Sequence, residues 1–200
     1  MSKKKYPLRI PRSANGIRSQ EPRSGARRIW WAERWQRTLE AMCPGVRLGK
    51  ARSYAISGQV VGITIESSHV EAVVVGSRPE PYAVTVDFRT PDPEQRARIK
   101  LALAKEPILA ARLLAGDLPF EAEEAFRLEG LDLFPGGKLA PGRYDMTTRC
   151  SCPDYANPCK HTLAALCILG EEVARRPSLL LELRGIDVDE LIPSDIPEDS

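Results

Sequence analysis

The stretch that decides the fold of this chain reads Cys150-Ser-Cys-Pro-Asp-Tyr-Ala-Asn-Pro-Cys-Lys-His161. Its spacing is C-x-C-x6-C-x-H, and its members are Cys150, Cys152, Cys159 and His161. Residues two apart in an extended segment point to the same side, so the first two cysteines can present two thiolates to one point. Cys159 and His161 stand at the predicted start of a helix. Three sulfur atoms and one imidazole nitrogen suit a tetrahedral Zn²⁺ ion.

Charge and ligand number predict that this zinc ion is structural. Three thiolates and a neutral imidazole around Zn²⁺ leave a net charge of about −1, which the flanking Arg149 and Lys160 can offset. The protein fills all four ligand positions, so no position remains for a reactive water molecule. We therefore expect one structural zinc ion and no hydrolytic one.

Other cysteine chemistries fit the spacing less well. A redox pair at Cys150 and Cys152 would not need Cys159 or His161. An iron–sulfur cluster usually takes four thiolates, so Cys167 would have to replace His161. Disulfides are disfavoured by the intracellular location that the sequence indicates. We expect Cys167 and Cys43 to behave as small buried apolar residues.

Working outward from this cluster, the hydrophobic pattern predicts an α+β chain. The predicted architecture is an N-terminal helix plus a three-stranded antiparallel meander, a helical linker and a C-terminal ββα-like zinc finger. The elements behind it are helices at 29–42, 94–106, 108–115, 120–129 and 162–176, and strands at 56–65, 70–75, 82–88 and 144–149.

Composition divides the chain further. Residues 1–52 hold 14 Lys and Arg against 3 Asp and Glu, a net charge of +11, whereas the remaining 148 residues carry −9. The first 28 residues almost lack large apolar side chains, which predicts a disordered basic arm. The predicted units are a basic arm at 1–28, a helix and sheet at 29–90, a helical linker at 91–130, a zinc finger with its following helix at 131–185, and an acidic tail at 186–200.

No apolar run approaches the length of a bilayer span, and the lysines near the N-terminus precede no apolar stretch. We therefore expect a cytoplasmic protein that can associate with the nucleoid, with no membrane partner.

The Cys-x-Cys…Cys-x-His segment resembles the SWIM zinc finger. Flanking motifs extend the resemblance over about residues 29–185 to the small prokaryotic SWIM zinc finger proteins. They are Trp30-Trp31, Arg52-Ser53-Tyr54, Gly76-Ser77-Arg78-Pro79 before Tyr82, Leu133-Phe134-Pro135, and Leu179-Leu180 with Leu183-Arg184-Gly185. The resemblance implies a ββα finger that binds DNA or protein, in association with Swi/Snf-type helicase-like ATPases. The basic arm and the acidic tail have no counterpart in it.

Two functions follow as hypotheses. The first is binding to DNA or RNA, and the predicted contacts are Arg27, Arg28, Trp30, Arg34 and Arg37. Trp30 is expected to be exposed because it lies off the helix face formed by Trp31 and Trp35. The alternative is a protein–protein interaction adaptor without nucleic-acid contact.

An enzyme acting on a small-molecule substrate is not expected. His69 is predicted to be a solvated loop residue, and the sequence shows no nucleophile with an adjacent base.

Overall fold

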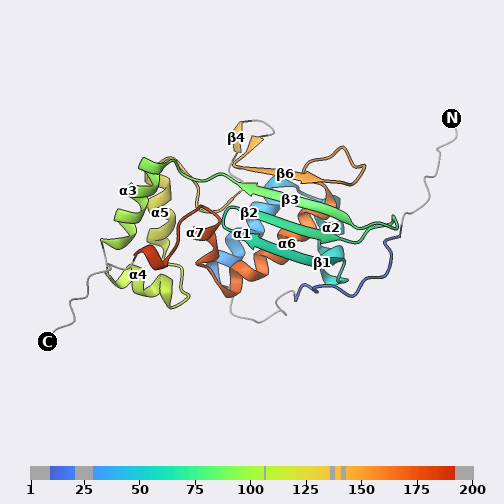
Figure 1. Cartoon of the computed structure of the whole chain (residues 1–200), viewed down its shortest axis with the longest axis horizontal. Helices are drawn as coiled ribbons and strands as arrows, with labels where there is room; N and C mark the ends of the chain where they lie inside the picture. The colour runs from blue at the N-terminus through green and yellow to red at the C-terminus, as the bar shows by residue number, and fades with distance from the viewer. Residues whose placement is uncertain (1–9, 21–28, 106, 136–137, 141–142, 192–200) are drawn as a thin grey trace.

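A four-stranded antiparallel sheet forms the centre of the protein (Figure 1). We describe it from a computed structural model that covers residues 10–20, 29–105, 107–135, 138–140 and 143–191. The strands run in the order β1-β2-β3-β6. Their bounds are Val60–Glu66 for β1, His69–Val74 for β2, Tyr82–Phe88 for β3 and Met146–Cys150 for β6. The predicted α+β class is confirmed, and the predicted meander gains a fourth strand from the cysteine-rich segment.

One face of this sheet is buried and the other is open to solvent. Along β2, Val70, Ala72 and Val74 are buried while Glu71 and Val73 are exposed. Strand β3 repeats the alternation, since side chains two apart in a strand share a face. The buried side chains lie against α6 (Lys160–Arg175), and α1 (Trp30–Met42) and α2 (Val46–Ile56) pack against that helix, behind the sheet in Figure 1.

Helix α6 is the centre of the core. Every residue from His161 to Gly170 is buried, and the helix contacts α1, α2 and all four strands of the sheet. Trp35 of α1 is 1% exposed and donates its indole N–H to the carbonyl of Leu166, 3.0 Å away. Its ring lies on Gly170, where a Cβ atom would stand only 2.4 Å from the ring. A residue without a side chain is therefore required at Gly170.

Helix α2 corrects the sequence analysis, which predicted a strand from residue 56 and no helix over 46–56. After Pro44 the chain passes through Gly45, whose φ of 85° favours glycine. The new helix then buries only Leu48, Ala51, Tyr54 and Ala55. This segment has few apolar residues and a basic composition, and it forms a helix because α6 covers its apolar side.

The remaining helices lie at the end of the sheet away from α2 (Figure 1). Helices α3 (Pro93–Ala104), α4 (Pro107–Leu114) and α5 (Phe120–Leu128) match the predicted linker helices closely. Asp92 and Gln95 form a capping box that begins α3. The other elements are β4 (Lys138–Ala140), β5 (Arg143–Tyr144), α7 (Leu179–Glu182) and the 3-10 helix η1 (Asp189–Leu191). No helix within the described ranges is long and apolar enough to cross a membrane.

Part of the predicted disordered arm is ordered. Ile17 forms a β-bridge with Val60, and the backbone N–H of Arg12 donates to the carbonyl of Gly76 at 2.9 Å. Residues 10–20 therefore lie against β1 and the end of β2, because the outer edge of β1 has free backbone groups to pair. Residues 1–9 and 21–28 lie outside the described residues.

The predicted finger and tail are likewise parts of one core. Strand β6 pairs with β3, so the predicted boundary at residue 131 separates strands of one sheet. Arg184, 2% exposed, donates to the carbonyls of Leu133 and Arg89 and to the carboxylate of Asp145. Buried side chains continue into the predicted tail at Ile186, Val188 and Leu191, and residues 192–200 lie outside the described residues.

We expect Gly170→Ala to lower the free energy of unfolding by about 1–3 kcal/mol, since the added methyl group overlaps the Trp35 ring. Gly49→Ala is the matched control. Gly49 is also helical, but nothing lies within 4 Å of the position that an added methyl group would take, so this change should stabilise by about 1 kcal/mol. Urea unfolding of both variants measures the difference. Equal effects would contradict the role of the Gly170–Trp35 contact.

Candidate metal centre

The four candidate ligands come from the end of β6 and the beginning of α6. Cys150 is the last residue of β6, and Cys152 follows two residues later. Cys159 is the N-cap of α6, and His161 is the second residue of that helix. Their ligand atoms all lie within 4.8 Å of one another. Cys159 and His161 are buried, whereas Cys150 and Cys152 are half-buried.

The geometry fits a tetrahedral zinc ion. His161 Nδ1 lies 3.9 Å from Cys150 Sγ and 3.8 Å from Cys159 Sγ. Bonds of about 2.3 Å to sulfur and about 2.0 Å to nitrogen place two neighbouring ligands roughly 3.6 Å apart in a tetrahedron. Nδ1 is therefore the nitrogen that would bind the metal. The predicted ligand set is brought together, and it fits one structural zinc ion.

The three cysteine thiols differ in pKa and therefore in how readily each forms the thiolate that binds a metal. A hydrogen bond from Cys150 lowers the pKa of Cys159 well below the usual thiol range, and the same bond raises the pKa of Cys150. Burial raises the pKa of Cys152. The first thiolate therefore forms at the helix N-terminus, where the helix dipole favours negative charge. Zinc must displace protons from the other thiols, so its affinity falls as pH falls.

Aromatic packing holds the His161 ring in place. The ring lies 4.5 Å from that of Tyr82 and 5.4 Å from that of Tyr54, measured between centroids. Gly76 closes the third side, where a Cβ atom would stand 2.4 Å from the Tyr82 ring and 3.3 Å from His161 Nε2. Nε2 is buried and has no hydrogen-bond partner among the described residues. Packing thus replaces the hydrogen bond that usually orients a metal-bound histidine.

Sequence reasoning did not assign Tyr54, Gly76 and Tyr82 to this site. They lie in flanking motifs that the sequence analysis used only for the resemblance to SWIM proteins. The fold brings all three residues to His161. Tyr54 could have been assigned only if a helix over 46–56 had been predicted, and the hydrophobic pattern did not indicate that helix.

The two predicted flanking cations differ in position. The Lys160 ammonium lies over the Tyr54 ring, 5.0 Å from its centroid, directly beside the ligands. Arg149 is exposed on β6, where it lines a surface hollow that Cys150 also lines. Lys160 therefore lies beside the ligands, whereas Arg149 adjoins Cys150 in the strand, and the charge compensation expected of the two stays a prediction.

The predicted nucleic-acid contacts are not gathered beside the cluster. Arg34 forms an ion pair with Glu123, and Arg37 forms one with Glu33. Trp30 was predicted to be exposed, and this is wrong, because its ring stacks on Phe120 at 4.2 Å and its N–H donates to the carbonyl of Leu118. These contacts lie at the α5 end of the molecule. Arg27 and Arg28 lie outside the described residues.

The predicted loop position of His69 is also wrong. His69 is the first residue of β2, where its two ring nitrogens face Asp87 and Glu71. The hydrogen bond with Asp87, followed by that with Glu71, raises the pKa of His69. This histidine takes no part in the cluster of candidate metal ligands.

A closed set of three cysteines and one histidine, joining a strand to a helix, defines a structural zinc finger. Comparison identifies its kind, because residues 143–166 match the SWIM zinc finger. The chain therefore carries a SWIM zinc finger.

The chain is also similar to the uncharacterized protein Rv2102 of Mycobacterium tuberculosis (strain ATCC 25618 / H37Rv). The two are 36% identical over 177 residues, which are 88% of this chain and 62% of that relative. The chain thus spans less than two thirds of the relative's length. No solved structure matches the chain.

We expect Cys152→Ser to lose its zinc and to unfold about 10 °C or more below the wild type, since a missing ligand removes binding energy that stabilises the fold. Cys43→Ser is the control, because Cys43 is even more buried than Cys152 but lies outside the cluster. Elemental analysis should find one zinc ion per chain in the control. A full complement of zinc in Cys152→Ser would contradict the assigned ligand set.

Proposed function

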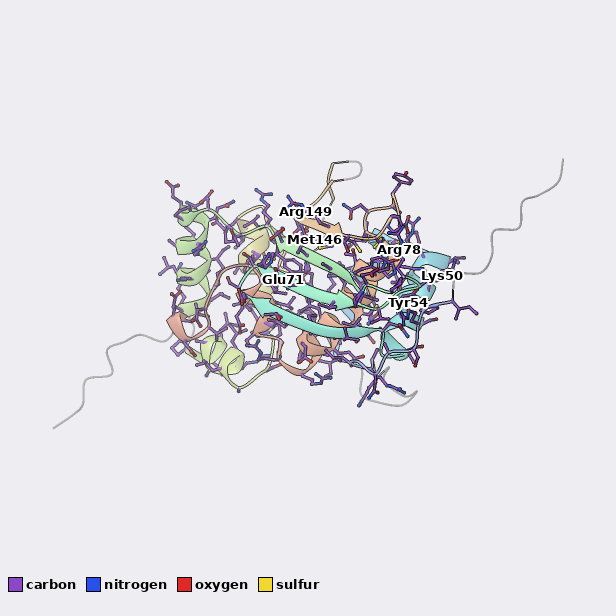
Figure 2. The ribbon with its side chains drawn as sticks, turned by 45° about the vertical axis from the view of Figure 1, so that its right-hand side comes forward. Lys50, Tyr54, Glu71, Arg78, Met146 and Arg149 are labelled. Atoms are coloured by element: carbon purple, nitrogen blue, oxygen red, sulfur yellow. The ribbon has the colours of Figure 1, made fainter. Side chains whose placement is uncertain are left out.

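We propose that the zinc finger end of this protein binds nucleic acid, with phosphate contacts from a group of cations that we call the basic end: Arg12, Lys50, Arg78 and Lys160. Lys160 covers Tyr54, and Lys50 precedes Tyr54 by one helical turn. Figure 2 labels Lys50, Tyr54 and Arg78 at the same end of the molecule.

The β2–β3 turn and the N-terminal segment add the other two cations. Gly76 packs against His161, and Arg78 follows it by two residues. Arg12 is held at the same turn by its backbone hydrogen bond to Gly76. The members of the basic end therefore lie on segments that contact His161 or its neighbours Tyr54 and Gly76, although they come from four parts of the chain.

The observation that carries the proposal is that these cations lack acidic partners. Within the described part of the chain, Arg12, Lys50 and Arg78 form no ion pair, and all three are exposed. The arginines of α1, by contrast, are paired with glutamates. Glu80 and Asp154 are the acidic residues in the adjoining loops. Unpaired cations that neutralise phosphates release the counterions condensed on the nucleic acid, and this release favours binding.

The test is fluorescence anisotropy of a labelled oligonucleotide with the zinc-loaded full chain at several salt concentrations. We expect the double variant Lys50→Ala, Arg78→Ala to bind more weakly and to lower the slope of log K against log salt by about 2. Arg37→Ala is the control, because Arg37 is paired with Glu33 and lies on α1. A double variant that binds like the wild type would contradict the proposed surface.

A second candidate function, docking to a helicase-like ATPase, has support at the opposite end. Leu101 of α3 and Ile108 of α4 are 61% and 70% exposed, on two helices that contact each other. Two large apolar side chains exposed on helices that contact each other are candidates for such a contact.

For this second function, we expect the double variant Leu101→Ser, Ile108→Ser to abolish co-elution with a co-expressed Swi/Snf-type ATPase while leaving the oligonucleotide Kd unchanged. Val46→Ser is the control, since Val46 is 76% exposed on α2 at the zinc end. Equal co-elution of the wild type and the double variant would count against docking through α3 and α4.

A further inference from the structure

A hollow of about 260 Å³ lies beside the zinc finger, on the outer edge of β6. The loop over 151–158 forms its other wall. Asn157 holds this loop against the strand, because its amide N–H donates to the carbonyl of Thr148 at 3.1 Å and its amide oxygen accepts from the Thr148 hydroxyl. Arg149, Asp154 and Tyr155 line the hollow together with Thr148 and Asn157.

Tyr155 stands at the rim of this hollow with its whole side chain in solvent, at a relative exposure of 104%. Its ring stacks on no other ring within the described ranges. The backbone beneath it is fixed, since the carboxylate of Asp154 accepts from the N–H of Ala156 at 3.1 Å. The loop therefore presents a free aromatic face on a held backbone, and a planar ligand can stack on it at little cost in ordering.

The charges of the lining favour a nucleobase over a phosphate. Arg149 and Asp154 contribute one positive and one negative charge, and Cys150 and Cys159 belong to a zinc–thiolate site of about −1, so the lining carries no excess positive charge to attract a phosphate. Thr148, Asn157 and Asp154 place hydroxyl, amide and carboxylate groups around it, which suit the donors and acceptors of a base edge. Its volume is below the roughly 300–1,000 Å³ of pockets that enclose drug-sized ligands, so a single planar ring fits better than a whole cofactor.

The hollow adjoins the basic end. Cys150 and Cys159 line the hollow and also belong to the zinc cluster, and Lys160 follows Cys159 directly. A strand of nucleic acid crossing this region would meet cations on one side of the zinc finger and an aromatic ring on the other.

We infer that the hollow takes one unpaired base of a single-stranded nucleic acid, stacked on Tyr155 and flanked by Arg149. This inference rests on the proposed function and adds a strand preference to it. A base paired in a duplex would first have to leave the helix stack, which costs a few kcal/mol. The basic end contacts phosphates in either form, whereas the Tyr155 contact is available only to the single strand.

The experiment compares a labelled single-stranded oligothymidine with a duplex of equal length, using zinc-loaded full chains. Tyr155→Ala should weaken single-strand binding by roughly tenfold, as the loss of one stacked base does, and leave duplex binding unchanged. Tyr155→Phe retains the ring and should bind like the wild type. Because Tyr155 is fully exposed, zinc content and thermal unfolding of both variants should match the wild type.

Each outcome bears on one of the two proposals. Unchanged single-strand binding by Tyr155→Ala, or an equal loss for single strand and duplex, would overturn the base-binding inference while the basic end stands. If Tyr155 instead contacts a protein partner, the variant binds both nucleic acids as the wild type does, which also overturns it. Absence of any binding by the wild type at low salt would overturn both proposals.

Discussion

Coordination of one metal ion by the end of β6 and the beginning of α6 is the constraint on which the structure depends. The ligands Cys150 and His161 belong to two elements that both reach the core. Helix α6 then crosses the buried face and contacts every strand of the main sheet. Fixing its first turn fixes its register against α1, including the fit of Trp35 on Gly170. The finger is thus an integral part of the core rather than an appended module.

The side chains around the metal connect this core to the surface. Tyr54 contacts His161 on one side and Lys160 on the other, so a single ring links a ligand to a half-buried cation. Gly76 is similarly shared, since it packs on His161 and accepts the hydrogen bond from Arg12. A structural zinc ion can therefore shape a binding surface without touching the bound molecule, because it orders the residues that carry the surface charges.

The two ends of the molecule differ in how their charges are compensated. At the α5 end, most cations form ion pairs with carboxylates, as Arg34 does with Glu123. In the interior, each guanidinium nitrogen of Arg184 donates to a carbonyl or to Asp145, and losing one partner of such a buried ion pair is strongly destabilising. Around the zinc, exposed cations are left without acidic partners in the described residues. Both the phosphate contacts and the base contact that we propose belong to this end.

Local sequence determined the ligand set, because the spacing of Cys150, Cys152, Cys159 and His161 is itself a local geometry. It also determined β3, whose alternation of buried and exposed residues is unambiguous. Only tertiary structure decided that residues 46–56 form a helix, since their weak apolar stripe needs α6 to cover it. The tertiary structure also brought Trp30 onto Phe120 and placed Tyr54, Gly76 and Tyr82 around His161. These contacts join residues far apart in the chain, and no local pattern specifies which distant side chain fills a given space.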